Sequence, residues 1–166
     1  FNPLHDGHRG LADAAERLSG RRADYEISVR NVDKPELPYT EILRRAAQER
    51  DGRRLLLTTE PTFAGKARCL PGTWFAIGFD TAVRLVDPAY YGGDVGVMGS
   101  ALAGLLASGS RFLVAGRSID GQYRRLADLT IPAEFADLFI DIPEEAFRLD
   151  LSSTEIRERG SCPPTT

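Results

Sequence analysis

The sequence predicts an α/β protein with a doubly wound, mainly parallel sheet and helices on both faces. Segments with apolar residues at helical spacing alternate along the chain with short apolar runs. Those runs are continuous, as in parallel strands that are covered on both faces. A chain of 166 residues suits one domain with a single core. In such a fold, ligands bind at the carboxyl ends of the strands.

The first half of the chain is expected to form helix, strand, helix and strand in that order. Apolar residues over 11–18 have helical spacing, and Gly20 stands where a C-terminal cap belongs. Residues 25–29 alternate between apolar and polar side chains, as a strand does. After a proline-bearing loop, helical spacing returns over 42–47, and the run 55–59 predicts a strand buried on both faces.

The second half is expected to add three helices and three strands. The helices are predicted over 63–70, 81–86 and 98–107, and the strands over 75–77, 112–115 and 138–142. The first two of these strands are apolar throughout, which again favours burial on both faces. Several glycines lower the helix propensity of the segment 92–109.

The charge balance argues against polyanionic partners. The chain has 21 Lys and Arg against 24 Asp and Glu, so it lacks the basic field that draws proteins to nucleic acid polymers or anionic membranes. Cys69 and Cys162 are too few for a disulfide framework. No run has the roughly 20 apolar residues that a membrane span needs. We therefore expect a cytoplasmic protein.

Both histidines of the chain, His5 and His8, lie in the segment FNPLHDGH at residues 1–8, just before the first predicted helix. A helix N-terminus offers free N–H groups and a favourable dipole to an anion. Imidazoles can donate to phosphate oxygens whose charge grows during reaction, so the pattern points to phosphoryl chemistry. Two other interpretations stay open, namely local hydrogen bonds in the loop and a metal pair that lacks its remaining ligands.

A second polar group lies near the C-terminus in LSSTEIR, residues 151–157. A hydroxyl at a helix N-cap leaves the following N–H groups for an anion, and Arg157 would project from the first turn. This arrangement predicts a second phosphate site. The alternative is an ordinary capping box from Ser152 to Glu155, with Arg157 in solvent.

Together the two segments resemble the signature motifs of the nucleotidylyltransferase superfamily, especially nicotinate and nicotinamide mononucleotide adenylyltransferases. The matching patterns are Phe-x-Pro-x-His-x-Gly-His and Ser-Ser-Thr-x-Ile-Arg. The resemblance implies the Rossmann-like fold of that superfamily and transfer of AMP from ATP to a small phosphorylated acceptor, with release of pyrophosphate. Nicotinamide or nicotinate mononucleotide is the acceptor it implies. Mg²⁺ would be held mainly by the ATP phosphates, with no protein metal ligand.

The resemblance also assigns roles to individual residues. His5 and His8 would contact the triphosphate and stabilise the transition state at the α-phosphorus, with Arg157 as the third catalytic residue. Ser153 and Thr154, with Arg157, would hold the β- and γ-phosphates of the leaving pyrophosphate. A direct in-line attack of this kind needs no protein nucleophile.

A third match concerns the nucleotide pocket. Gly78 and Asp80, at the end of a predicted strand, are similar to a Gly-x-Asp segment that lines this pocket in the family. Arg117 resembles a family arginine that follows a late strand. Two other interpretations stay open, with Asp80 as the N-cap of the next helix and Arg117 as a surface residue.

The acceptor side matches the family less well. Lys34, followed by Pro35, stands where related enzymes carry Lys-Pro near the acceptor, and Lys66 is a further candidate for a phosphate. In bacterial members of the family, a tryptophan that follows the Gly-x-Asp segment in the sequence stacks on the acceptor ring. This chain has Tyr90 and Tyr91 in the corresponding region. Either tyrosine could supply the aromatic face instead.

The family motif is preceded by a strand that ends in glycines, and here the chain begins at Phe1. We therefore expect residues 1–166 to be one nucleotidylyltransferase-like domain that lacks its first strand and can belong to a longer chain. The expected partners are ATP and a small phosphorylated acceptor, and a homo-oligomer is compatible with the sequence. The alternatives are pantetheine-phosphate adenylyl transfer, cytidylyl transfer from CTP, and a non-catalytic nucleotide-binding or weakly ATP-hydrolysing module.

Overall fold

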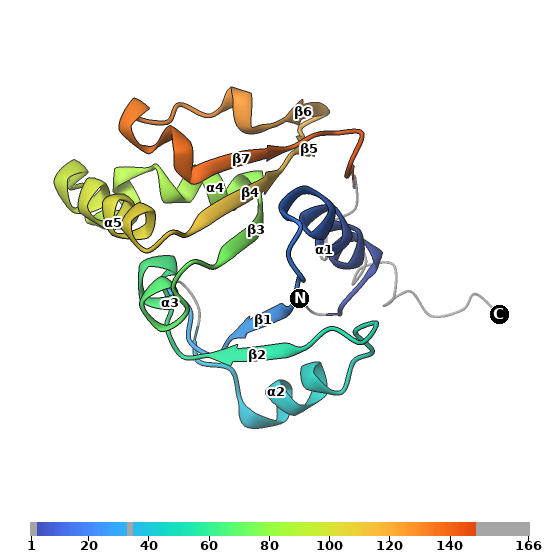
Figure 1. Cartoon of the computed structure of the whole chain (residues 1–166). Helices are drawn as coiled ribbons and strands as arrows, with labels where there is room; N and C mark the ends of the chain where they lie inside the picture. Colours follow the sequence, from blue (N-terminus) through green and yellow to red (C-terminus); the bar gives the residue numbers. More distant parts are fainter. Residues whose placement is uncertain (1–2, 33–34, 149–166) are drawn as a thin grey trace.

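The structure, a computed structural model, describes residues 3–32 and 35–148 (Figure 1). Its helices are α1 (Asp6–Ser19), α2 (Tyr39–Ala46), α3 (Phe63–Cys69), α4 (Phe79–Leu85) and α5 (Val95–Ala107). Its strands are β1 (Tyr25–Ser28), β2 (Leu55–Thr58), β3 (Trp74–Gly78), β4 (Arg111–Ala115), β5 (Arg117–Ile119), β6 (Gln122–Arg124) and β7 (Phe139–Ile142). Each predicted helix and strand is present, but the two do not alternate throughout, because α5 follows α4 without a strand and no α-helix separates β4 from β7.

Five of the described strands form parallel sheets, which confirms the α/β class, but they do not form one continuous sheet. β1 pairs with β2, β3 pairs with β4, and β4 pairs with β7, all in parallel. No described hydrogen-bonded strand joins β1 to β3, so the sheet is divided between them. Figure 1 shows β2, β1, β3, β4 and β7 in sequence from the bottom of the molecule to the top.

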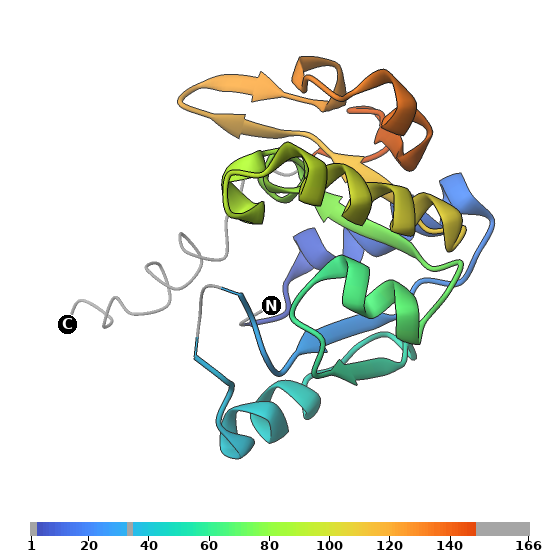
Figure 2. The same ribbon diagram turned by 90° about the vertical axis from the view of Figure 1, so that its left-hand side faces the viewer.

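Helices cover the strands from two sides. Alternate residues of β4 belong to different core clusters, because successive side chains of a strand point to opposite faces. Phe112 and Val114 pack with residues of α3, α4 and α5, which lie toward the viewer in Figure 2. Leu113 and Ala115 pack with Ala14 and Ala15 of α1 on the other face. None of the helices in the described ranges is long and apolar enough to cross a membrane.

Two helices show how local sequence sets their ends. α1 ends at Ser19 and is capped by Gly20, which has a left-handed backbone (φ 66°) and donates its N–H to the Glu16 carbonyl. α5 begins at Val95, earlier than predicted, because the Asp94 carboxylate accepts from the N–H groups of Gly96 and Val97. The glycine-rich α5 is helical despite its low propensity because it buries Met98, Leu102 and Leu105.

The prediction that β2 and β3 are buried on both faces is wrong. Leu57 of β2 is 51% exposed, since β2 is the last strand of its sheet. Ala76 of β3 is also exposed, on a strand whose one described neighbour is β4. β4 alone meets the expectation, with Phe112 to Ala115 all buried.

The antiparallel hairpin of β5 and β6 was not predicted. Asp120 and Gly121 form its turn with φ values of 49° and 77°, the left-handed conformation that two-residue hairpins require. The Asp-Gly pair was the sequence signal for this turn. The hairpin brings Tyr123 so close to Gly116 that an added Cβ would lie 2.6 Å from the Tyr123 hydroxyl oxygen.

The core on the α5 side can be tested by one substitution. Leu102 is fully buried among the larger cluster, so Leu102→Ala should lower the free energy of unfolding by about 2–5 kcal/mol in urea denaturation. Val97→Ala on the same helix is the control, because Val97 is 52% exposed and should change it by less than about 0.5 kcal/mol. Equal effects of the two variants would contradict the packing of α5.

Candidate functional site

The two histidines cap the N-terminus of α1. His5 is the N-cap residue, and its Nδ1 accepts a hydrogen bond of 3.1 Å from the Gly7 N–H. His8 Nδ1 in turn accepts from the His5 N–H at 3.3 Å. The ring centroids are 3.9 Å apart, at an interplanar angle of 43°. The imidazoles thus form a reciprocal capping box in which they replace the usual hydroxyl and carboxylate.

This arrangement determines the protonation of both rings. Because each Nδ1 accepts a hydrogen bond, each neutral ring carries its proton on Nε2. Burial lowers the pKa of His8 to about 3, and the nearby His5 adds to this shift. Burial also lowers the pKa of His5. At neutral pH both rings are therefore uncharged.

The expected free N–H groups at this helix end are partly in use. The Gly7 N–H donates to His5 Nδ1, and the N–H groups of His8 and Arg9 donate to the His5 carbonyl. The structure therefore contains the local hydrogen bonds of the first alternative interpretation.

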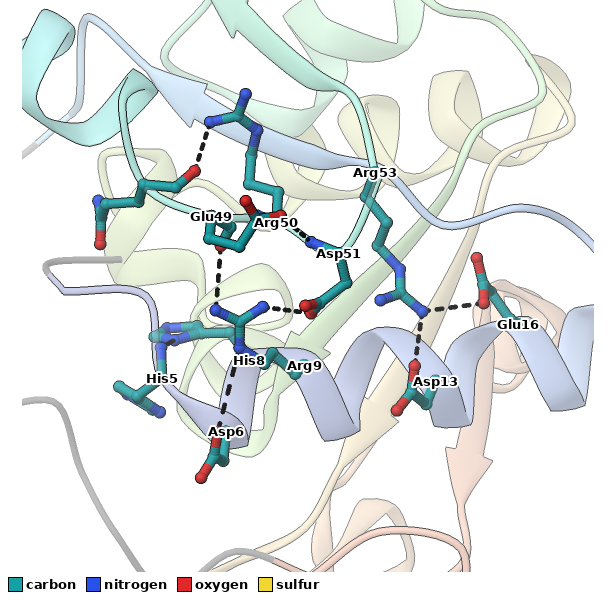
Figure 3. A network of polar contacts seen from close by, with 11 residues as sticks. His5, Asp6, His8, Arg9, Asp13, Glu16, Glu49, Arg50, Asp51 and Arg53 are labelled. Atoms are coloured by element: carbon teal, nitrogen blue, oxygen red, sulfur yellow. Dashed lines mark hydrogen bonds and ion pairs between the residues drawn. The ribbon is translucent and has the colours of Figure 1, made fainter.

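The turn between α2 and β2 holds this histidine loop from one side (Figure 3). Gln48 Oε1 accepts from the Leu4 N–H at 2.6 Å. Arg9, on the first turn of α1, pairs with the Asp51 carboxylate and donates to the Glu49 carbonyl at 3.0 Å. The start of α1 is thus attached to residues more than 40 positions away in the sequence.

Arg53 continues this attachment along α1. Its Nη2 lies 2.5 Å from Asp13 Oδ1 and 2.9 Å from Glu16 Oε2, and its side chain is only 11% exposed (Figure 3). Glu16 also accepts from the Ala23 N–H at 2.8 Å. These contacts fix α1 against the start of β2, and they had no signal in the sequence because local spacing does not pair distant charges.

Gly78, Asp80 and Arg117 come together at the carboxyl ends of β3 and β4. Gly78 is the last residue of β3, and it pairs with Ala115 of β4. Arg117 follows two residues later and forms an ion pair with Asp80. The interpretation of Asp80 as an N-cap is wrong, because Gly78 takes that position and Asp80 lies in the first turn of α4.

Gly78 is not required by the fold. Its φ of −81° is open to any residue, and an added Cβ would have no neighbour within 4 Å. The space at the end of β3 therefore allows another molecule to approach the backbone closely, which is a common reason for glycine at such a position.

Tyr90 and Tyr91 line one cavity of about 290 Å³, together with Arg84. The segments after three strands meet there, with Asn31 and Val32 after β1, Pro61 to Phe63 after β2, and Thr81 after β3. The cavity thus lies at the carboxyl ends of the strands, as the fold class predicts.

The two tyrosines differ in their freedom to bind a ligand. The Tyr91 hydroxyl donates to the Leu85 carbonyl at 3.0 Å, and burial raises its pKa. Tyr90 is 46% exposed, and the Arg84 guanidinium carbon lies 5.5 Å from its ring centroid. Tyr90 is therefore the better candidate for stacking, and Arg84 is a cation at this cavity that the sequence analysis missed.

The remaining candidates are placed as follows. Lys66 is buried, with its Nζ 3.0 Å from Glu26 Oε2 and 2.6 Å from Ser28 Oγ, so its charge is already paired. Lys34, Ser153, Thr154 and Arg157 lie outside the described residues. Across 3–32 and 35–148, no three His, Cys, Asp or Glu side chains gather as a metal site would require.

Comparison with protein-family models, with curated proteins and with solved structures finds no match to this chain. Three features of the described structure bear on its function, namely the histidine pair, the Gly78–Asp80–Arg117 group and the Tyr90 cavity.

The lowered pKa of His8 predicts a pH dependence of stability. The folded protein keeps His8 neutral down to about pH 3, whereas an unfolded chain protonates it near its ordinary pKa of 6.5. Between these values the unfolded state binds more protons, so the free energy of unfolding should fall as the pH is lowered through this window. Urea denaturation from pH 7 to 4 measures the slope.

The variant His8→Asn keeps a side-chain acceptor and lacks the titrating ring, so its slope should be shallower than that of the wild type. His5→Asn, at the less buried ring, should change the slope less. The wild type and the two variants contain the same carboxylates, so differences among their slopes come from the histidines. Equal slopes for the wild type and His8→Asn would show that the pKa of His8 is not lowered in the folded protein.

Proposed function

We propose that the protein is a nucleotidylyltransferase with a doubly wound, Rossmann-like fold. It transfers AMP from ATP to a small phosphorylated acceptor, such as nicotinamide or nicotinate mononucleotide, and releases pyrophosphate. The observation that carries this proposal is the pair of adjacent imidazoles at the N-terminus of α1, whose Nδ1 atoms both accept backbone hydrogen bonds. With their protons on Nε2, the two rings would donate to an anionic group in the proposed reaction.

The histidines would act through hydrogen bonds. In the proposed reaction an acceptor phosphate oxygen attacks the α-phosphorus and forms a new P–O bond. The bond from that phosphorus to the bridging oxygen breaks, and pyrophosphate leaves with its electrons. Charge grows on the phosphate oxygens during this step, and the Nε2–H groups of His5 and His8 would stabilise it. Mg²⁺ enters as part of the nucleotide substrate, and no step is assigned to a protein-held metal.

The second part of the proposal places the nucleotide and the acceptor. Gly78 leaves its backbone open at the carboxyl end of β3, where the superfamily resemblance expects the nucleotide pocket. The Tyr90 cavity offers an aromatic face beside the Arg84 cation, which suits a ring that carries a phosphate. Ser153, Thr154 and Arg157 are assigned to the outgoing pyrophosphate on the resemblance alone.

One observation favours a second candidate, a nucleotide-binding module without turnover. Both Nδ1 atoms already serve as caps of α1, and the Gly7 N–H is satisfied by His5. This is the full set of bonds that a purely structural cap needs. In that case the protein would bind ATP but would not use an acceptor.

The two candidates differ in the release of pyrophosphate. The assay uses the full chain with Mg²⁺ and ATP or CTP, and compares nicotinamide mononucleotide, nicotinate mononucleotide, phosphopantetheine and no acceptor. Release that depends on one acceptor supports the transferase and identifies its substrate. ATP binding with no release by any acceptor supports the binding module, and acceptor-independent phosphate release supports a weak ATPase.

Turnover should depend strongly on His8. His8→Asn retains an acceptor for the His5 N–H and loses the ring Nε2–H, so kcat should fall by about 10²–10³-fold with little change in stability at pH 7. The pyrophosphate assay gives kcat, and the unfolding midpoint at the same pH shows that the fold is retained. A variant with near-normal kcat would remove His8 from the mechanism.

The acceptor site should depend on Tyr90. Tyr90→Ala removes the exposed ring and should raise the acceptor KM by about tenfold while the ATP KM stays constant. Tyr39→Ala is the matched control, because Tyr39 is 72% exposed and does not line the cavity. Equal changes of the ATP and acceptor KM values would place Tyr90 outside the acceptor site.

A further inference from the structure

The outer edge of β2 has no partner strand within the described residues. β2 pairs with β1 through one edge, and no described strand pairs with the other. Residues 55–59 read Leu-Leu-Leu-Thr-Thr, without the charge or proline that commonly keeps a sheet edge from associating. Leu57, in the middle of this run, is 51% exposed. An apolar strand edge of this kind is a template for pairing with another strand.

The hydrogen bonds to the β1 segment show which backbone groups of β2 point outward. The carbonyls of Arg54 and Thr58 accept from N–H groups of that segment at 2.9 and 2.8 Å. Successive residues of a strand direct their backbone groups to opposite edges. The N–H and C=O groups of Leu55 and Leu57 therefore face away from β1, where a further strand would find them.

A groove of about 400 Å³ lies beside β2. Residues 56–60 line it from the strand and the segment after it, and Lys66, Cys69 and Leu70 line it from α3. α2 contributes no residue to this groove and lies to one side of β2 in Figure 2. The groove therefore leaves space on the α3 side of β2 for the side chains of an added strand.

The charges at the two ends of β2 fit an antiparallel copy of the same strand. Arg54 precedes the strand with its side chain 72% exposed, and Glu60 follows it with its side chain 39% exposed. Both residues are three positions from Leu57. When the Leu57 residues of two copies lie directly opposite each other, Arg54 of each copy therefore lies opposite Glu60 of the other, which is a favourable cross-strand pair. In-register parallel pairing would instead place the two arginines side by side.

Both charged residues already have one partner and can take a second. Arg54 donates to Asp24 through Nε and Nη2 at 3.0 and 2.6 Å, and a guanidinium has further N–H donors. Glu60 lies 3.8 Å from Arg68, and a carboxylate has further acceptor positions. Pro61 favours extended backbone at Glu60 and lacks an N–H group, so strand pairing would extend to Glu60 and stop there.

We propose that two copies of this chain associate through β2, as an antiparallel strand pair centred on Leu57. The Leu57 N–H of each copy would donate to the Leu57 carbonyl of the other, and Leu55 of each copy would exchange the same bonds with Thr59 of the other. A two-fold axis would relate the copies, so the dimer would leave neither β2 edge free. The proposal does not depend on the proposed function, because it rests on a strand edge and its flanking charges alone.

Sedimentation velocity of the full chain from about 1 to 200 μM tests the association, since a strand pair of this length makes a small interface and a weak dimer. The mass should rise with concentration from 18.2 kDa toward twice that value and no further. Leu57→Lys places two like charges on the two-fold axis and should raise the dissociation constant by at least about tenfold. Val97→Lys is the matched control, because Val97 is 52% exposed on α5 and should leave the constant unchanged.

Two charge reversals test the antiparallel register. Arg54→Glu and Glu60→Arg each place like charges opposite each other, so each variant alone should dimerise at least about tenfold more weakly. An equimolar mixture of the two should dimerise about as tightly as the wild type, because each mixed dimer has opposite charges at both ends. Thermal midpoints check that both variants fold.

Three results would each overturn the proposal. The first is a mass of 18.2 kDa at every concentration, and the second is a mass that grows beyond that of a dimer. The third is an equal loss of association in Leu57→Lys and Val97→Lys. A mixture of the charge variants that associates no better than either alone would overturn the antiparallel pairing centred on Leu57.

Discussion

The burial of β4 on both faces is the interaction on which the other parts of the structure depend. Phe112 lies at the centre of an aromatic group, with ring centroids of Phe63, Phe75 and Phe139 at 5.2, 5.7 and 5.4 Å. On the opposite face Leu113 packs with α1. β4 contributes to both clusters and therefore fixes the helices on both faces of the sheet. On one face it positions α1, which carries the histidines. On the other face it positions α4 and α5, which border the Tyr90 cavity.

The histidine pair is both a structural cap and the centre of the proposed chemistry. The Nδ1 atoms hold the first turn of α1, and this bonding leaves the protons on Nε2. Burial keeps the rings neutral, so they would act on phosphate by donating hydrogen bonds, without a net charge. In the proposed reaction the same contacts that stabilise the helix would also orient the two rings, since a fixed ring has fewer orientations to lose when it meets an anion.

The N-terminal half of the sheet is attached to the rest of the protein mainly through side chains. Arg53 joins the start of β2 to Asp13 and Glu16 of α1, and Arg21 donates to the Gly72 carbonyl before β3 at 2.8 Å. No described ladder of backbone hydrogen bonds crosses from β1 to β3.

The sequence alone determined the order of helices and parallel strands, the C-terminal end of α1 and the position of His5 and His8 at its start. These features depend on local spacing and on capping, which a short segment carries by itself. Only the tertiary structure decided the division of the sheet, the exposure of Leu57 and Ala76, the Asp80–Arg117 pair and the choice of Tyr90 over Tyr91. Each of these depends on which distant segment lies alongside, and a continuous apolar run has the same pattern whether one or both of its faces are covered.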